Sequence, residues 1–492
     1  MRFARGWLVV ALAALTCACS AGSAIAVPAE PLGHAGRWVT DAKGRVVILH
    51  GVNMVYKREP FAPDAAGFSA DDADFLAAHG FNTVRVGVIY KALEPQPGAY
   101  DNAYRERIFR TARMLARRGI FPQIDFHQDL YNERFQGEGF PDWAVQDDGL
   151  PAEPKMGFPN NYLFMPALWR AYDHFWANDP GPGGIGLQDR YAAAWRHVAK
   201  RFHAKPWLLG YDLFNEPWPG TQWPTCANPA GCPVFDGGPL TEFSKRVLSR
   251  IREVNRRKLV WYEPNVIFNS GADTHHGDTG DARAGMSFHI YCLPEAFSIP
   301  GLPPESCDVL ERLVLTNAEE QAARTDDALL VSEFGATDNL ETIGRIVDAS
   351  DDSMLSWQYW HYCACDDPTT SGPGVQALVI DANEPPSGDN VKEAKLRVLS
   401  RPYPQIVAGT PTGFGFDPDS REFSLSYSTE RAGGGGFASR YGTVVFVPRG
   451  HYPDGYQVDV EGATVTSAPN AKLLRLVAHR GATEVKLTIN PK

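Results

Sequence analysis

The stretch Leu208-Leu209-Gly210-Tyr211-Asp212-Leu213-Phe214-Asn215-Glu216-Pro217 joins a mostly apolar run to an amide and a carboxylate. Residues 208–214 predict a buried strand, because a short apolar run bounded by proline and polar residues is typical of a strand inside a sheet. A helix-like stretch separates this run from the next apolar run, at residues 260–266. Strands that alternate with helices form parallel sheets, so the stretch predicts one unit of an α/β fold.

The same unit of strand and helix repeats along the first 360 residues. The apolar runs are at residues 46–52, 83–89, 121–126, 208–214, 260–266, 285–291, 328–334 and 354–359. Eight such units predict a (β/α)8 barrel, or TIM barrel, in which the residues that act follow the strands.

The longest connection, residues 130–186, follows the third predicted strand and is rich in aromatic side chains. Connections of this length are usually functional. We expect most of its rings to pack against one another and a few to line a cleft.

The character of the chain changes near residue 401, and neither tryptophan nor cysteine occurs after Cys365. Short runs of alternating polarity follow, at residues 422–427, 442–447, 457–460, 473–477 and 484–489. They predict a small C-terminal antiparallel β-sandwich domain. We therefore expect the catalytic barrel at residues 27–404 and the sandwich at residues 405–492. Because the sandwich lacks tryptophan, a packing role is favoured over carbohydrate binding.

Residues 1–26 have the pattern of a secretory signal peptide: Arg2 and Arg5, a short apolar run, and small residues ending at Ala26. The apolar run is too short to cross a bilayer, which takes about 20 residues. We expect cleavage after Ala26 and a secreted protein. The alternative is a lipoprotein anchored through Cys19.

Cysteine usage agrees with export, because six cysteines remain when Cys17 and Cys19 are set aside. Each of two pairs flanks a short loop, and we expect the disulfides Cys226–Cys232 and Cys292–Cys307. One residue separates Cys363 from Cys365, a spacing that strains a direct disulfide, so their state stays open. The sequence contains no CxxC pair, the spacing that would indicate a zinc site.

The charge balance excludes one class of partner. The chain has 47 basic and 58 acidic residues, a net charge of −11, and no dense run of Lys and Arg. Nucleic-acid binding usually needs a basic patch, so we expect no nucleic-acid partner. Charged residues make up 21% and apolar residues 44%, which is typical of a folded chain. We expect a monomer.

Two predicted strands end in glutamates. Glu216 follows residues 208–214, and Glu333 interrupts the apolar run 328–334. Two carboxylates at one barrel mouth can face each other across a bound sugar, as glycoside hydrolysis requires. We assign Glu216 as the general acid/base and Glu333 as the nucleophile, and expect one of the two pKa values to rise. The alternative is a pair of structural glutamates, each paired with a cation.

Other strand ends supply polar and aromatic side chains. Arg85 could keep the nucleophile ionised, His127 and Asp129 could bind sugar hydroxyls, Tyr291 could hydrogen-bond the nucleophile, and Trp360 could form the floor of a sugar site. A metal site is the alternative for His127 and Asp129, but no third ligand is spaced for it. We expect no metal and no cofactor.

These motifs resemble glycoside hydrolase family five, which has Asn-Glu-Pro after strand four and Glu-Phe-Gly after strand seven. Within that family the chain is similar to bacterial endoglycoceramidases, through the stretches at residues 126–129, 212–217, 289–291, 333–335, 401–404 and 407–411. The resemblance implies cleavage between the oligosaccharide and ceramide of glycosphingolipids, with retention of configuration. It also implies a supporting shell of Arg85, His127, Asn215, His289, Tyr291 and Trp360, with Lys57 and Asp129 at the sugar headgroup.

Some positions depart from the family pattern, namely the loop 54–58 and the region of Cys363 and Cys365, which leaves the preferred sugar series open. Three alternatives remain: a cellulase or mannanase acting on polysaccharide, an enzyme restricted to galactosyl-linked ceramides, and a binding protein on an inactive barrel. A glycosphingolipid substrate implies transient contact with lipid micelles or a membrane surface. We expect the insertion 130–186 to supply an apolar surface for the lipid chains.

Overall fold

The computed structural model describes residues 28–292, 306–370, 372–438 and 441–492. The expected signal peptide at residues 1–26 and Cys19 lie outside the described residues. Across the described part of the chain, no helix combines the length and the hydrophobicity needed to cross a membrane.

Eight parallel strands close into a barrel, as the sequence predicts. They are β4 (His50–Met54), β5 (Thr83–Ile89), β6 (Phe121–His127), β7 (Gly210–Asp212), β8 (Leu259–Tyr262), β9 (Ala284–Ile290), β10 (Ala328–Phe334) and β11 (Trp357–Tyr359). The barrel closes where β11 pairs with β4, with Trp357 opposite His50. Every residue of these strands is buried, because helices cover the outside and side chains fill the inside.

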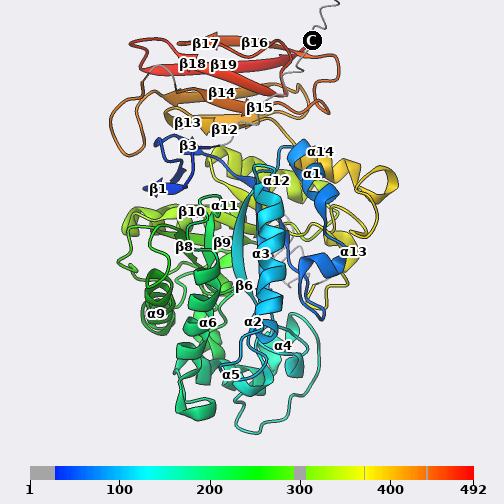
Figure 1. The fold of residues 1–492 in the computed structure, drawn as a ribbon, viewed down its shortest axis with the longest axis vertical. Coiled ribbons are helices and arrows are strands. Elements are labelled where there is room, and N and C mark those ends of the chain that lie inside the picture. The colour runs from blue at the N-terminus through cyan, green and yellow to red at the C-terminus, as the bar shows by residue number, and fades with distance from the viewer. Residues whose placement is uncertain (1–27, 293–305, 371, 439–440) are drawn as a thin grey trace, which may run out of the picture.

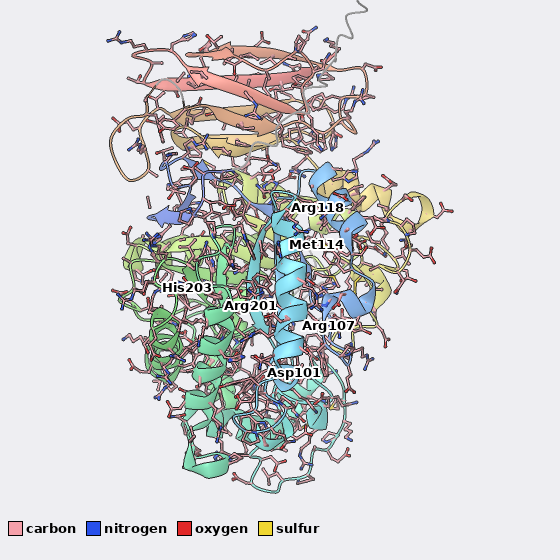
Figure 2. All side chains as sticks on the ribbon, in the orientation of Figure 1. Asp101, Arg107, Met114, Arg118, Arg201 and His203 are labelled. Carbon is pink, nitrogen blue, oxygen red and sulfur yellow. A yellow bond between two sulfur atoms is a disulfide. The ribbon has the colours of Figure 1, made fainter. Side chains whose placement is uncertain are left out.

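The helices surround the barrel and run roughly along it (Figure 1). The main ones are α1 (Ala70–Ala78), α3 (Asn102–Ala116), α6 (Leu187–Arg201), α9 (Thr241–Arg252), α11 (Cys307–Thr325), α12 (Leu340–Asp352) and α14 (Glu393–Leu399). Helix α3 begins after Asp101, whose carboxylate accepts the backbone N–H groups of Ala103 and Tyr104. Figure 2 shows Asp101 and Arg118 at opposite ends of this helix, where Arg118 pairs with Asp74 of α1 at 2.6 Å.

The first predicted strand is two strands in the structure. Residues Val46–Val47 form β3, which pairs with β12 (Tyr403–Val407) of the C-terminal sheet, and the barrel strand β4 starts only at His50. The apolar run is continuous because both strands are buried. Val46 of β3 packs in the core of the sandwich, whereas Val52 and Met54 of β4 pack in the core of the barrel. The eighth strand is also shorter than predicted, since Met354 has a positive φ of 55° and regular pairing begins at Trp357.

Two antiparallel sheets form the C-terminal sandwich. One has the order β1 (Gly33–Ala35), β2 (Trp38–Thr40), β3, β12 (Tyr403–Val407), β15 (Thr443–Phe446), β18 (Leu473–Ala478) and β17 (Ala463–Val465). The other has the order β13 (Thr410–Phe416), β14 (Phe423–Ser428), β19 (Glu484–Pro491) and β16 (Tyr456–Glu461). The sequence did not indicate that three strands preceding the barrel complete the first sheet.

The insertion after β6 contains the helices α4 (Asn160–Phe164) and α5 (Pro166–Trp176) and lies at the end of the barrel away from the sandwich (Figure 1). Its rings pack mostly against each other: Tyr131 stacks on Phe140 at 3.9 Å, and Phe175 meets Phe140 edge-on at 5.0 Å. The insertion therefore has a small aromatic core of its own.

Among the residues that the structure describes, three disulfides connect nearby segments. Both expected bonds, Cys226–Cys232 and Cys292–Cys307, are present. Cys363 and Cys365, whose state the spacing left open, are also bonded to each other.

Candidate active site

Glu216 and Glu333 meet at the C-terminal end of the barrel. Glu216 lies just after β7 and Glu333 lies near the end of β10. One oxygen of each carboxylate and a ring nitrogen of His289 all lie within 4.8 Å of one another. Glycoside hydrolysis uses two carboxyl groups that flank one glycosidic bond. The two glutamates therefore lie close enough to act on the same bond.

Glu333 accepts hydrogen bonds at both oxygens. Arg85 donates from Nη1 to Oε1 at 2.5 Å, and the Tyr291 hydroxyl donates to Oε2 at 3.1 Å. Burial raises the pKa of Glu333 to about 7, while His289 and Arg85 oppose the rise. One of the two pKa values is therefore raised, as expected, but it belongs to the assigned nucleophile, which must be ionised to attack. Burial outweighs the neighbouring cations, so the ionised form of Glu333 predominates only above about neutral pH.

Glu216 is held through its backbone and through one oxygen. Its N–H donates to Glu263 Oε2 at 2.8 Å, and its backbone has a positive φ of 46°. Its Oε1 accepts from Asn269 Nδ2 and from His289 Nδ1, each at 2.8 Å. Glu263 and Asn269 were not among the predicted site residues. Glu263 could have been found, because it follows an apolar strand just as Glu216 does.

Arg85 is fully buried and lies among four carboxylates. It is within 3.0 Å of Asp125, Asp212, Glu263 and Glu333. Burial raises the pKa of Asp212 to about 8, although Arg85 opposes the rise. A cation in this position lowers the pKa of the neighbouring carboxyl groups against the effect of burial, and its hydrogen bonds fix their direction.

Two buried histidines pair with carboxylates of the site. Burial opposes the charge of His289, but Glu263 and Glu333 raise its pKa well above the usual range. His127 donates to Asp125 at 2.8 Å, and its other ring nitrogen lies 3.3 Å from Asp129. Burial opposes its charge too, but the carboxylates raise the pKa of His127 to about 9. Both rings are therefore cationic donors at neutral pH.

Lys57 lies in the same cluster of charged side chains, next to Asp129. The residue is 3% exposed. Its ammonium lies 2.7 Å from Asp129 and 3.3 Å from Asp367, and 4.5 Å from the centre of the Trp360 ring. Burial opposes the charge, but Asp129, Asp367 and Glu138 raise the pKa of Lys57 above its usual range. Cation and ring together form a polar corner with an aromatic wall.

Glu138 corrects one expectation from the sequence. His127 and Asp129 do have a third potential metal ligand in space, since ligand atoms of all three residues lie within 4.8 Å of one another. Glu138 comes from the insertion, which folds back beside β6. The Lys57 ammonium lies 3.9 Å from Glu138, so these carboxylates already have a protein side chain as their cation.

A cavity of about 730 Å³ connects these residues to an apolar surface. We call one set of lining residues the charged half: Lys57, Asp129, Glu216, Tyr291, Glu333, Trp360 and Thr369. We call the other set the apolar half: Phe158, Tyr162, Leu163, Trp218, Trp223, Val266, Ile267 and Ile346. In the apolar half the rings of Phe158, Tyr162, Trp218 and Trp223 contact one another in turn.

Four of the expected site residues lie behind the cavity wall: Arg85, His127, Asn215 and His289. Asn215 accepts from Arg85 at 2.9 Å and donates to the Gln128 carbonyl at 3.1 Å. Both ends of its amide are therefore engaged by protein groups.

Two family models match the chain. "Cellulase (glycosyl hydrolase family 5)" matches residues 40–366, and "Glycoside hydrolase family 5 C-terminal domain" matches residues 401–490. The chain belongs to glycoside hydrolase family 5. Like the other enzymes of this family, it is a glycosidase, and its two glutamates lie on the barrel that the first model covers.

Relatives match over nearly the full length. Endoglycoceramidase I of Rhodococcus hoagii is 34% identical over 475 residues, covering 94% of this chain and 89% of the relative. Endoglycoceramidase of Hydra vulgaris is 27% identical, covering 89% and 84%. The structure of endo-glycoceramidase II from Rhodococcus sp. in a ganglioside GM3 complex has a TM-score of 0.74 and 27% identity, covering 92% of this chain and 99% of that one.

Proposed function

We propose that this family 5 enzyme is an endoglycoceramidase, which hydrolyses the β-glycosidic bond between the oligosaccharide and the ceramide of glycosphingolipids. The observation that carries the proposal is the single cavity with a charged half and an apolar half, because the substrate has the same two parts. The full-length relatives named endoglycoceramidases support it.

The reaction proceeds by double displacement. Glu333 attacks the anomeric carbon, and the bond to the glycosidic oxygen breaks as Glu216 gives that oxygen its proton, so ceramide leaves as an alcohol. Glu216 then takes a proton from water, whose oxygen attacks the same carbon and releases Glu333. Two inversions give net retention. The lactosyl-enzyme intermediate solved for the Rhodococcus sp. relative supports a covalent step.

The other predicted residues support these two steps. Arg85 and Tyr291 hold Glu333, and His289 holds Glu216. We assign Lys57, Asp129 and Trp360 to the sugar headgroup, because they line the charged half next to Glu333. Asn215 and His127 act from behind the wall, through Arg85 and Asp129.

The apolar half takes the lipid chains of ceramide. Phe158, Tyr162 and Leu163 of the insertion line this half, together with Trp218 and Trp223 from the loop after β7. Rings and aliphatic side chains on two sides suit flexible acyl chains. A complex in which ceramide made no contact with residues 130–186 would contradict this assignment.

Three exposed apolar side chains lie in or next to segments that line the cavity, and we assign them to transient contact with lipid micelles or a membrane. Val375 lines the cavity and is 40% exposed, Phe164 follows the lining residue Leu163 and is 51% exposed, and Leu313 lies beside Gly271, next to the lining residue Ser270, and is 37% exposed. Exposed apolar patches are typical of protein-interaction or membrane-interaction sites. Polar substitutions at these three positions should weaken sedimentation with glycosphingolipid vesicles without changing turnover in detergent.

The proposed enzyme is secreted after removal of residues 1–26 and acts as a monomer. N-terminal sequencing of the mature protein tests the cleavage site, and metabolic labelling with palmitate tests the alternative anchor on Cys19. Size-exclusion chromatography with light scattering tests the monomer.

Mass spectrometry of the products is the decisive experiment. After incubation with mixed glycosphingolipids in detergent, we expect free ceramide and intact oligosaccharide. Oligosaccharides from glucan or mannan without ceramide release would favour the polysaccharide hydrolases instead. Consumption of galactosyl-linked ceramides alone would favour the restricted specificity.

A further inference from the structure

The segment that follows β8 holds Glu216 from two directions. Glu263, the first residue after β8, accepts the Glu216 backbone N–H at 2.8 Å. Asn269, in the short helix η7 (Val266–Ser270), donates from Nδ2 to Glu216 Oε1, also at 2.8 Å. Both side chains are buried.

Asn269 is itself held in place. Its backbone carbonyl accepts the N–H of Tyr291 at 3.1 Å, and Asn265 caps η7 by accepting the N–H of Ile267 at 3.1 Å. Asn269 also lines the cavity. Its amide is therefore fixed relative to Glu216 and to Tyr291, the hydroxyl donor of Glu333.

The two oxygens of Glu216 differ in their surroundings. Oε1 accepts two N–H groups, from Asn269 and from the His289 ring, whereas no residue in the described part of the chain makes a hydrogen bond to Oε2. Glu263 and Glu333 keep His289 cationic against the effect of burial on its pKa, so this ring is a donor. An oxygen with two N–H donors directed at it is a poor position for a proton, which leaves Oε2 to carry it.

We propose that Asn269 is a positioning residue that keeps the catalytic proton of Glu216 on Oε2. The proposal rests on the acid/base role assigned to Glu216 above. In the first step the Oε2–H bond breaks, the proton moves to the glycosidic oxygen, and the electron pair of the broken C–O bond stays on that oxygen. In the second step Oε2 takes a proton from the attacking water. Without Asn269 the proton also occupies Oε1, where it does not reach the leaving group.

Aryl β-lactosides test the proposal. They carry no ceramide, and they differ in how much their aryl leaving group needs to be protonated as it departs. Phenoxide is a poor leaving group and requires protonation, whereas 2,4-dinitrophenolate leaves without it. General acid catalysis contributes roughly 100- to 10,000-fold. We expect Asn269→Ala to lower kcat/KM for phenyl lactoside by about 30-fold, within that contribution, and for dinitrophenyl lactoside by less than about 3-fold.

Two further variants separate positioning from folding. Asn269→Asp keeps the size of the side chain but removes the N–H donor, and we expect the same dependence on the leaving group. Asn317→Ala is the matched control, since the Asn317 amide supports the same loop by donating to the carbonyls of Gly271 and Ala272, at 3.2 and 3.1 Å. Asn317→Ala should change kcat/KM by the same factor for the two lactosides.

The outcomes distinguish this proposal from the proposed function. Equal losses on both lactosides in Asn269→Ala and Asn269→Asp would overturn it. A loss seen only with glycosphingolipids would also overturn it and make Asn269 a ceramide contact. Glu216→Ala is the reference: if that variant shows no dependence on the leaving group, the acid/base assignment itself fails.

Discussion

The two halves of the cavity are built from different parts of the chain. In the charged half, Glu333 lies near the end of a barrel strand, whereas Glu216 and Trp360 follow strands. Each makes hydrogen bonds with groups on other strands or connections. In the apolar half, Phe158 and Trp223 come from long connections. Reacting groups need fixed positions, which the barrel provides, whereas lipid chains need only an apolar surface. The bond-breaking chemistry is therefore placed on the rigid scaffold, and lipid recognition on the loops.

The largest effect is expected at Glu333. Glu333→Ala removes the nucleophile and should lower kcat/KM by at least about 10,000-fold on glycosphingolipids and on lactosides alike. Circular dichroism should show an unchanged fold. Substantial residual hydrolysis would show that the charged half does not supply the nucleophile.

The second largest effect is expected at Lys57. Lys57→Met leaves Asp129, Asp367 and Glu138 without their shared cation, and breaking a buried pair costs about 3 to 5 kcal/mol. We expect denaturant unfolding to show this loss of stability and kcat/KM to fall at least tenfold. Lys91→Met is the control, because Lys91 forms exposed pairs with Glu133 and Asp142, worth about 1 kcal/mol or less. Equal effects of the two substitutions would contradict the role of Lys57.

The apolar half should respond selectively. Trp223→Ala removes a large apolar side chain worth about 1.5 to 3 kcal/mol when buried against lipid, so KM for glycosphingolipid should rise roughly tenfold or more. Phenyl lactoside, which has no lipid, should be hydrolysed at nearly the normal rate. Ile185→Ser serves as the control, since Ile185 is an exposed apolar residue of the insertion that does not line the cavity. A similar loss on both substrates would mean that the two halves do not act separately.

The pH dependence should show the smallest effect and comes from the charged half alone. Glu333 attacks only when ionised, and burial raises its pKa to about 7. Its ionised fraction, and with it kcat/KM, should therefore fall about tenfold per pH unit below that value. Tyr291→Phe removes a donor that favours the ionised form, so this acidic limb should move to higher pH. A limb near pH 4 in the unaltered enzyme would contradict the raised pKa.

Much of the charged half could be predicted because its residues follow strands. An apolar run that ends in Glu216 or Glu333 is visible locally, and the barrel brings all such ends to one mouth. The partners could not be predicted, because they join distant segments. Glu138 approaches His127 and Asp129 only because the insertion folds back, and Asn269 reaches Glu216 across 53 positions of sequence.

The sequence by itself determined the alternation of strands and helices, the sandwich after residue 401 and the two glutamates that we propose as catalytic, because these depend on local periodicity and on residue type. Only the tertiary structure decided that β1, β2 and β3 complete the C-terminal sheet, that Lys57 lies among three carboxylates, and that Asn269 and His289 share one oxygen of Glu216. The physical reason is that hydrogen bonds and burial depend on distance in space, which packing sets after the local pattern has formed each element.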